Sequence, residues 1–381
     1  MRCYFDHNAT TPVDPRVAGA FAAAVAEVYG NASSVHQDGQ LARQRLESAR
    51  QDVARLLVCS AKEVVFSSGG TESANLAVLG AVRAGGQARR HVIASAIEHP
   101  AVLNACAQLE REGVEVTYLG PSRDGVIEPE AVRREIRPHT VLISLMHANN
   151  ETGVIQPVAA IGAIARDANV LFHSDGVQAA GKIPVNIADL GVDLYSISAH
   201  KFHAPKGCGA LYVRSGVEIQ PLQFGGRHER GRRAGTENVP GAIAMGLAAT
   251  LVRDDGARIA ALRDRLENGI LARVPDAAVN GAQGPRLPNT SNICFDGVEG
   301  EAVVVALDLL GFAVSSGSAC SSGAVEPSHV LLAMGLDKER AKSSVRFSLG
   351  RSNTEEQVDR LIEAVATSVS RLRALSPTYA V

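Results

Sequence analysis

The stretch "VLFHSDGVQAAGKIPVNIADLGVDLYSISAHK", residues 170–201, decides the fold class of this chain. It holds two short apolar runs, 170–175 and 194–199, with the composition of buried strands. The first run ends in Asp175, and the second leads to Lys201. Continuous apolar strands of this kind are typical of a parallel sheet that is covered on both faces.

Similar runs recur through the first two thirds of the chain. Further expected strands lie at residues 63–68, 91–96, 114–119, 141–147 and 209–213, and helical apolar spacing occurs at 40–58 and 71–82. Strands that alternate with helices predict an α/β fold, with a mainly parallel sheet between helices.

The pattern changes after about Gly256. A long amphipathic helix comes first, followed by the apolar segments "SNICF", "EAVVVALDLLG" and "SSVRFSLG" at 291–295, 301–311 and 343–350, and by a final helix from Thr354. We therefore expect a large domain at 14–256 and a smaller α/β domain made of 1–13 and 257–381.

Composition limits the class of protein. The chain has 381 residues, of which 46% are apolar and 20% charged, and its formal net charge is −2. This balance indicates neither nucleic acid nor a membrane surface as a direct partner. No run of about 18 apolar residues suggests a membrane span, and no secretory signal is expected. Six scattered cysteines without a CxxC pair give little support for a metal site. We expect reduced thiols and a cytoplasmic location.

A glycine pair lies between an expected strand and a helix in "FSSGGTES", residues 66–73. Gly70 would let backbone amides close on an anion at the helix N-terminus, and Thr71 could donate its hydroxyl. The alternative is an ordinary strand-to-helix turn in which Thr71 is the N-cap.

Asp175 and Lys201 each allow two interpretations. Asp175 ends a strand, where open α/β sheets bind ligands, so it could hold a protonated ring nitrogen; it could also cap the next turn. Lys201 could be a nucleophilic amine if it is buried, or a solvated loop residue. His99, in "SAIEHPAV", opens a helix and could be a cap or a catalytic residue. In this order, a phosphate cradle, a histidine, a carboxylate and a lysine fit pyridoxal phosphate, whose aldehyde, ring nitrogen and phosphate need these partners.

The sequence closely resembles the cysteine desulfurases of the NifS/IscS group, which are fold-type I pyridoxal-phosphate enzymes. The resemblance runs nearly end to end and is highly specific. It rests on "YFDHNATTPVDPRV", "NASSVHQDGQ", "SSGGTES", "EHPAV", "HANNETGVIQP", "HSDGVQAAGK", "SAHKFHAPKGCGALYV", "GGRHERGRRAGTEN", "SSGSACSSGAVEPSHVL" and "VRFSLGR".

The resemblance implies roles around the cofactor. Lys201 would bond covalently to it, Asp175 would pair with the pyridine nitrogen, and Gln178 would contact the ring hydroxyl. His99 would stack on the ring and help to move protons. The residues expected to hold the phosphate are Gly70, Thr71, Ser198 and His200.

Roles toward the substrate and a second subunit follow in the same way. Asn150 would contact cofactor or substrate, and Arg351 would bind the substrate carboxylate. Thr236 would reach the phosphate of the other subunit in a homodimer. Cys320, in the loop rich in serine and glycine, would take the sulfur of L-cysteine as a persulfide, and alanine would leave. The persulfide would pass to an acceptor protein such as an iron–sulfur scaffold.

Two other functions stay open: a class-V aminotransferase or lyase without thiol chemistry, and a non-catalytic partner protein of the same fold. The destination of the sulfur is also open, between nitrogenase-type clusters, general iron–sulfur assembly, and thiolation of tRNA or DNA. The sequence departs from the family pattern at His7, Ala199, Arg227 and His228. Of these, Arg227 and His228 put the detail of the subunit boundary and the choice of partner in doubt.

Overall fold

The computed structural model describes residues 2–86, 90–316 and 326–375. In this part of the chain, a seven-stranded sheet has the order β2-β8-β7-β6-β5-β3-β4. Its strands are β2 (Val64–Ser67), β3 (His91–Ser95), β4 (Glu115–Leu119), β5 (Thr140–Ser144), β6 (Leu171–Asp175), β7 (Leu194–Ser198) and β8 (Gly209–Val213). β8 alone runs opposite to the other six strands of this sheet. The expected mainly parallel sheet is thus confirmed.

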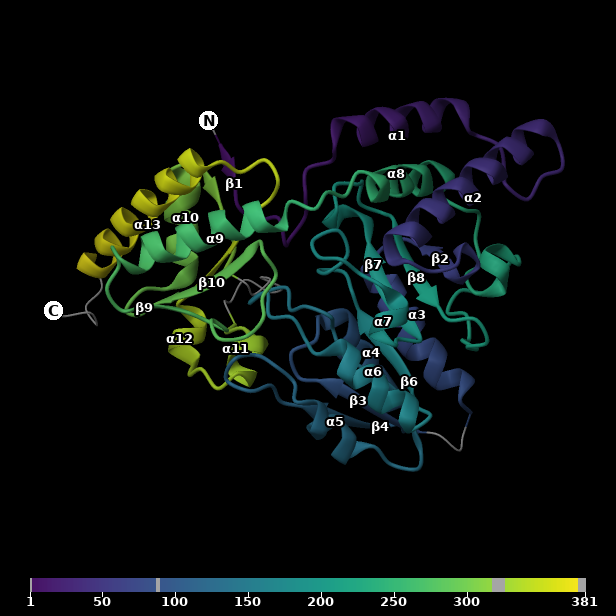
Figure 1. Ribbon diagram of the computed structural model, residues 1–381, viewed down its shortest axis with the longest axis horizontal. Coiled ribbons are helices and arrows are strands. Elements are labelled where there is room, and N and C mark those ends of the chain that lie inside the picture. Colours follow the sequence, from purple (N-terminus) through teal and green to yellow (C-terminus); the bar gives the residue numbers. More distant parts are fainter. Residues whose placement is uncertain (1, 87–89, 317–325, 376–381) are drawn as a thin grey trace.

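Helices cover both faces of this sheet (Figure 1). Consecutive residues of β3 show why: Val92 packs into one apolar core and Ile93 into the other, because side chains alternate along a strand. One face carries α3 (Gly70–Ala84) and α4 (Pro100–Arg111). The other carries α2 (Gln37–Leu57), α5 (Pro129–Glu135), α6 (Val158–Asp167), α7 (Ile187–Leu190) and α8 (Val239–Thr250). Helix α1 (Pro15–Glu27) packs on α8.

A separate apolar core joins Cys3 and Phe5 to side chains from residues 259–369. Its elements lie together at the left of Figure 1. They include the antiparallel sheet β12-β10-β9 and the parallel pair of β1 with β11. Their bounds are β1 (Cys3–Tyr4), β9 (Ala277–Val279), β10 (Thr290–Phe295), β11 (Phe312–Ala313), β12 (Ser344–Ser348), α9 (Gly256–Leu271), α10 (Gly300–Leu309) and α13 (Glu355–Leu375). The exact domain boundaries stay a prediction.

Short elements complete the described chain. They are α11 (His329–Ala333), α12 (Lys338–Lys342) and the 3-10 turns η1 (Ala61–Glu63), η2 (Ala199–Lys201) and η3 (His228–Gly231). Among the described residues, no helix is long and apolar enough to cross a membrane.

Candidate active site

The predicted site residues gather where β6 and β7 end. Asp175 is the last residue of β6 and Ser198 the last of β7, and η2 carries Lys201 directly afterwards. The start of α3 lies against the same strand ends: a Cβ on Gly70 would lie 2.7 Å from Val177 Cγ2 and 3.4 Å from Ser198 Cβ. Only glycine leaves the backbone this close. The fold therefore brings the glycine turn, the Asp175 carboxylate and Lys201 together at the carboxyl ends of the central strands.

The start of α3 fits a phosphate. The N-cap is Gly69, which has no side chain to accept from the first helical amides. The alternative with Thr71 as N-cap is therefore wrong, since Thr71 is the second residue of the helix and is exposed. Amides that no side chain caps, together with the helix dipole, form an anion site. The Ser198 hydroxyl is beside it, 3.8 Å from the Cβ position of Gly69.

Asp175 serves the turn and keeps one oxygen for a ligand. The residue is buried, and its Oδ1 accepts from the Val177 amide at 2.9 Å. The other carboxylate oxygen has no hydrogen-bond partner among the described side chains and amides. Burial raises the pKa of the Asp175 carboxyl, while His99 and Lys201 act in the opposite direction. The two interpretations of Asp175 are therefore compatible, with one oxygen for each.

Lys201 is held by the N-terminal segment. Its Nζ donates to the carbonyl oxygens of Asn8 at 2.5 Å and Ala9 at 2.9 Å. Burial lowers the pKa of Lys201 to about 8, and the nearby Arg346 adds to this effect. At pH 7 such an amine is neutral in about one molecule in ten, against about one in 3,000 at the ordinary value. Lys201 is thus suited to act as a nucleophile and a base.

Two histidines border the same site. His99 is the N-cap of α4, and its Nδ1 accepts from the Ala101 amide at 3.1 Å, so a neutral ring carries its proton on Nε2. The residue is exposed, yet the surrounding protein displaces water from the imidazole and lowers its pKa. His200 is partly buried, its Nδ1 lies 3.1 Å from Thr10 Oγ1, and burial lowers its pKa to about 4.

Asn8 bonds to several of the candidate residues, and sequence reasoning missed it. Its carbonyl accepts from Gln178 Nε2 at 3.0 Å as well as from Lys201, and its Oδ1 accepts from Lys182 Nζ at 2.7 Å. Lys182 also donates to Gln178 Oε1 at 2.5 Å. These bonds fix the amide orientation of Gln178, since the Asn8 carbonyl can only accept and so must face Nε2. Burial holds the pKa of Lys182 well below its ordinary value.

Arg351 and Lys201 line one cavity, together with Lys182, His7 and Asp14. Arg351 Nη2 donates to Asp14 Oδ2 at 2.5 Å. His7, one of the departures from the family pattern, is buried, and neither ring nitrogen has a hydrogen-bond partner among the described residues. Burial lowers its pKa to about 3, so the ring is neutral. With His7 neutral, the positive charge in this cavity comes from residues such as Arg351, which suits the carboxylate of an amino acid.

The remaining candidates have different outcomes. Asn150 is partly buried, and its carbonyl accepts from Asn8 Nδ2 at 3.1 Å and from Arg346 Nη1 at 2.9 Å. Thr236 is exposed and does not line the cavity with Lys201. Cys320 lies outside the described residues.

Four other cysteines are poor nucleophiles. Burial raises the pKa of their thiols to about 12 or 11, which leaves almost no thiolate at pH 7. These residues are Cys59 and Cys106, at about 12, and Cys208 and Cys294, at about 11. Within the described ranges, no cluster of three or more His, Cys, Asp or Glu side chains could hold a metal ion.

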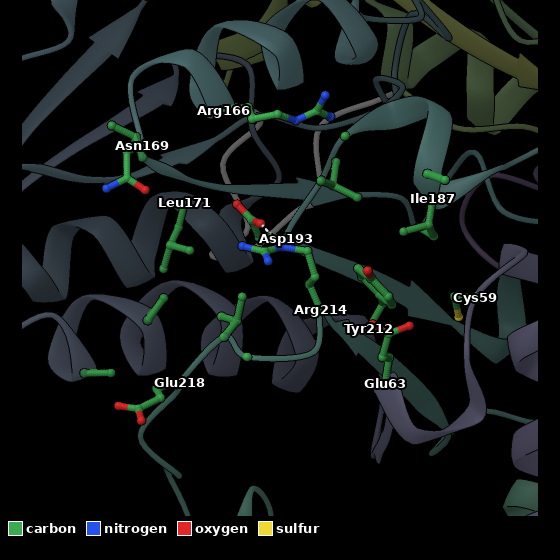
Figure 2. Close-up of a pocket in the computed structure, with 18 of the residues that line it drawn as sticks. Cys59, Glu63, Arg166, Asn169, Leu171, Ile187, Asp193, Tyr212, Arg214 and Glu218 are labelled. Atoms are coloured by element: carbon green, nitrogen blue, oxygen red, sulfur yellow. Dashed lines mark hydrogen bonds and ion pairs between the residues drawn. The ribbon is translucent and has the colours of Figure 1, made fainter.

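A second cavity, of about 750 Å³, lies near the amino ends of β5, β6 and β7, and Figure 2 shows Leu171, Asp193 and Arg214 among its lining residues. Val141 and Leu171, near the starts of β5 and β6, line it. Its charged groups are partly paired, since Arg214 Nε donates to Asp193 Oδ1 at 2.5 Å. None of the candidate residues named above lines it, so we place the chemistry at the carboxyl ends of the strands.

Comparisons with known proteins agree on one family. Residues 3–361 match the family Aminotransferase class-V. A protein of Anaeromyxobacter sp. (strain K), named cysteine desulfurase IscS, is 49% identical over 383 residues, which covers 99% of this chain and 94% of that protein. A solved NifS-like protein superposes with a TM-score of 0.91 and 38% identity, over 98% of this chain and all of that chain. The structure of SspA in complex with cysteine gives a TM-score of 0.83 and 34% identity, over 92% of this chain and 99% of that one.

Proposed function

The chain belongs to the aminotransferase class-V family and is a pyridoxal-phosphate-dependent cysteine desulfurase, and from this premise we propose which residues perform each step. The substrate is L-cysteine. The observation that carries the residue assignment is Lys201, an amine with a pKa of about 8 that shares a cavity with Arg351. The fold is that of the NifS-like enzymes.

The residues that would hold the cofactor lie at the carboxyl ends of β6 and β7 and at the start of α3. Amides at the start of α3, with Thr71, Ser198 and His200, would hold the phosphate. The unpaired oxygen of Asp175 would receive the pyridine N–H, and Gln178 would contact the ring hydroxyl. When bound, pyridoxal phosphate supplies an electron sink for the negative charge that develops at the substrate α-carbon.

The protein positions the substrate and moves its protons. Arg351 binds the α-carboxylate through its guanidinium fork, and Asn150 contacts cofactor or substrate. Lys201, in its neutral form, removes the α-proton. His99 would lie over the cofactor ring, and its neutral imidazole holds a proton at Nε2, because its Nδ1 accepts from the Ala101 amide.

Cys320 takes the sulfur. Its thiolate attacks the sulfur of the substrate, the substrate C–S bond breaks, and an S–S bond forms on Cys320. The proton that Cys320 loses is replaced in the balance by the one that alanine gains on its methyl carbon. L-cysteine and the protein thiol therefore give L-alanine and a persulfide without an external oxidant. The raised thiol pKa of four other cysteines supports this assignment, because each would supply very little thiolate.

Replacing Cys320 tests the assignment. Cys320→Ser should retain bound cofactor and bind L-cysteine, but form no persulfide and release almost no alanine. Persulfide labelling with mass spectrometry, beside an alanine assay, gives both readouts. Normal alanine release by this variant would refute the role of Cys320. Alanine release without persulfide in the wild type would instead favour a lyase without thiol chemistry.

We also propose that the enzyme is a homodimer with shared sites. The exposed Thr236 would contact the phosphate of the other subunit, and Phe224, 88% exposed in the preceding segment, supports a covered surface there. Thr236→Glu would place a carboxylate against that phosphate, and Lys201→Ala removes the covalent link. A purified heterodimer of these two variants should recover about half the activity, because one site collects both lesions. A heterodimer without activity would contradict sharing, provided that both variants fold.

The sulfur would pass to an iron–sulfur scaffold protein, which the name of the relative IscS supports. Transfer of labelled sulfur from the persulfide to a purified scaffold, compared with tRNA-thiolation acceptors, would test the destination. The cytoplasmic location stays a prediction, which cell fractionation would test.

A further inference from the structure

Asp14 connects Arg351, the proposed binding residue for the substrate carboxylate, to the start of α1. It is the N-cap of α1, and its Oδ1 accepts from the Arg16 amide at 2.9 Å and from Arg16 Nε at 3.0 Å. Its Oδ2 accepts from Arg16 Nη2 at 2.8 Å and from Arg351 Nη2 at 2.5 Å. Asp14 is 5% exposed, so this carboxylate is shielded from water.

These four bonds fix the carboxylate. A carboxylate offers about four lone-pair positions, and three of the four bonds come from one residue, Arg16. The backbone holds Asp14 as well, because its amide donates to the His203 carbonyl at 3.0 Å, two residues after Lys201. Asp14 is therefore tied to the segment that carries the catalytic lysine, and it has little freedom to turn.

The backbone of Arg351 is fixed from another side. Its carbonyl accepts from Arg258 Nη2 at 2.9 Å, and the preceding Gly350 amide donates to Asn353 Oδ1 at 2.7 Å. The side chain is 26% exposed, and the bond to Asp14 is its only polar contact with the described residues. Without Asp14, the long side chain would be free to rotate, and substrate binding would have to restrict it.

The charges leave room for an anion. Asp14 carries one negative charge between the positive charges of Arg16 and Arg351. The trio has a net charge of +1, which the α-carboxylate of an amino acid would bring to zero. Because one guanidinium nitrogen of Arg351 is used by Asp14, the other nitrogens can receive that carboxylate. The substrate does not have to displace Asp14.

We propose that Asp14 is a positioning residue for substrate recognition: its carboxylate orients the Arg351 guanidinium to receive the α-carboxylate of the amino-acid substrate. This inference rests on the proposed role of Arg351. It makes recognition of the carboxylate depend on a residue that itself does not touch the substrate.

The test compares ligands with and without a carboxylate. Asp14→Ser keeps a hydroxyl for the helix cap but cannot hold Arg351, whereas Asp14→Asn keeps an acceptor without the charge. In Asp14→Ser the KM for L-cysteine should rise about tenfold, with kcat changed less than about threefold, because a charge-assisted hydrogen bond is lost. Asp14→Asn should lie between this variant and the wild type. Asp337→Ser, which makes the same change at the exposed N-cap of α12, is the matched control and should stay near the wild type.

Binding to the holoenzyme provides a readout apart from turnover. L-alanine and ethylamine are titrated against the visible absorbance of the bound cofactor. Asp14→Ser should weaken L-alanine about tenfold and leave ethylamine unchanged. Equal weakening of both ligands, or tighter L-alanine binding, would overturn the inference. An Arg351→Ala variant with unchanged L-alanine binding would instead overturn the role of Arg351. A wild type that releases no alanine from L-cysteine would contradict the proposed sulfur transfer, but it would leave this comparison of ligands unaffected.

Discussion

The pKa of Lys201 predicts how the apoprotein takes up its cofactor. Only the neutral amine can attack the cofactor aldehyde. With a pKa of about 8 in place of 10.5, the neutral fraction at pH 7 is about 300 times larger. The rate of covalent uptake should therefore rise with pH and level off above about pH 8, rather than continue to rise to about pH 10.

Two neighbouring charges should move this midpoint in opposite directions. Arg346 disfavours the protonated amine and Asp6 favours it, and the two residues form an ion pair at 2.9 Å. Arg346→Gln should therefore raise the midpoint, and Asp6→Asn should lower it. The opposite signs matter, because general loosening of the site would shift both variants the same way, toward the ordinary pKa.

The assay uses apoprotein mixed with excess pyridoxal phosphate over a pH series from about 6 to about 10. Borohydride stops each reaction, and mass spectrometry measures the modified peptide that contains Lys201. Circular dichroism confirms that each variant is folded. A midpoint near pH 10 in the wild type, or shifts of the same sign in the two variants, would refute the reasoning.

Two further predictions concern stability and the cofactor cradle. Glu229→Gln should cost about 3–5 kcal/mol of unfolding free energy, because Arg50 and Glu229 form a buried ion pair with bonds of 2.6 and 2.8 Å. Asp359→Asn, in the exposed pair with Arg265, should cost at most about 1 kcal/mol. Equal costs for the two variants in urea titrations would contradict this difference. Gly70→Ala should speed loss of pyridoxal phosphate in dialysis without unfolding the protein, since its Cβ would lie 2.7 Å from Val177 Cγ2; unchanged retention would show that the turn can adjust.

Much of the site could be predicted because its residues follow strands. Asp175 and Lys201 come directly after buried apolar runs, and parallel strands of one sheet bring their carboxyl ends together. The alternation of apolar strands with helices also predicted a sheet that is covered on both faces. The antiparallel direction of β8 was not predictable in this way, since a buried strand has the same composition in either direction.

The residues that support the site were missed because their partners are distant in sequence. Asn8 bonds to Lys201 through its main-chain carbonyl, 193 positions away, and a carbonyl carries no side-chain signal. Asp14 looks like an ordinary helix cap before Pro15, and only the folded chain brings it to Arg351, 337 positions away. Thr71 was considered as an N-cap, but the N-cap is Gly69, two residues earlier.

The pairing of β1 with β11 has a consequence for biosynthesis. Cys3 pairs with Phe312, so the first strand to leave the ribosome must wait for 309 more residues before its partner is made. At ~5–20 residues per second, this wait lasts about 15–60 s. The strands of the seven-stranded sheet are all translated earlier, and so are Lys201 and His203, which bond to Asn8 and Asp14 of the N-terminal segment. Translation order thus leaves β1 without its partner strand until late, and a nascent chain stalled before residue 312 should contain the folded sheet with Cys3 and Tyr4 unpaired.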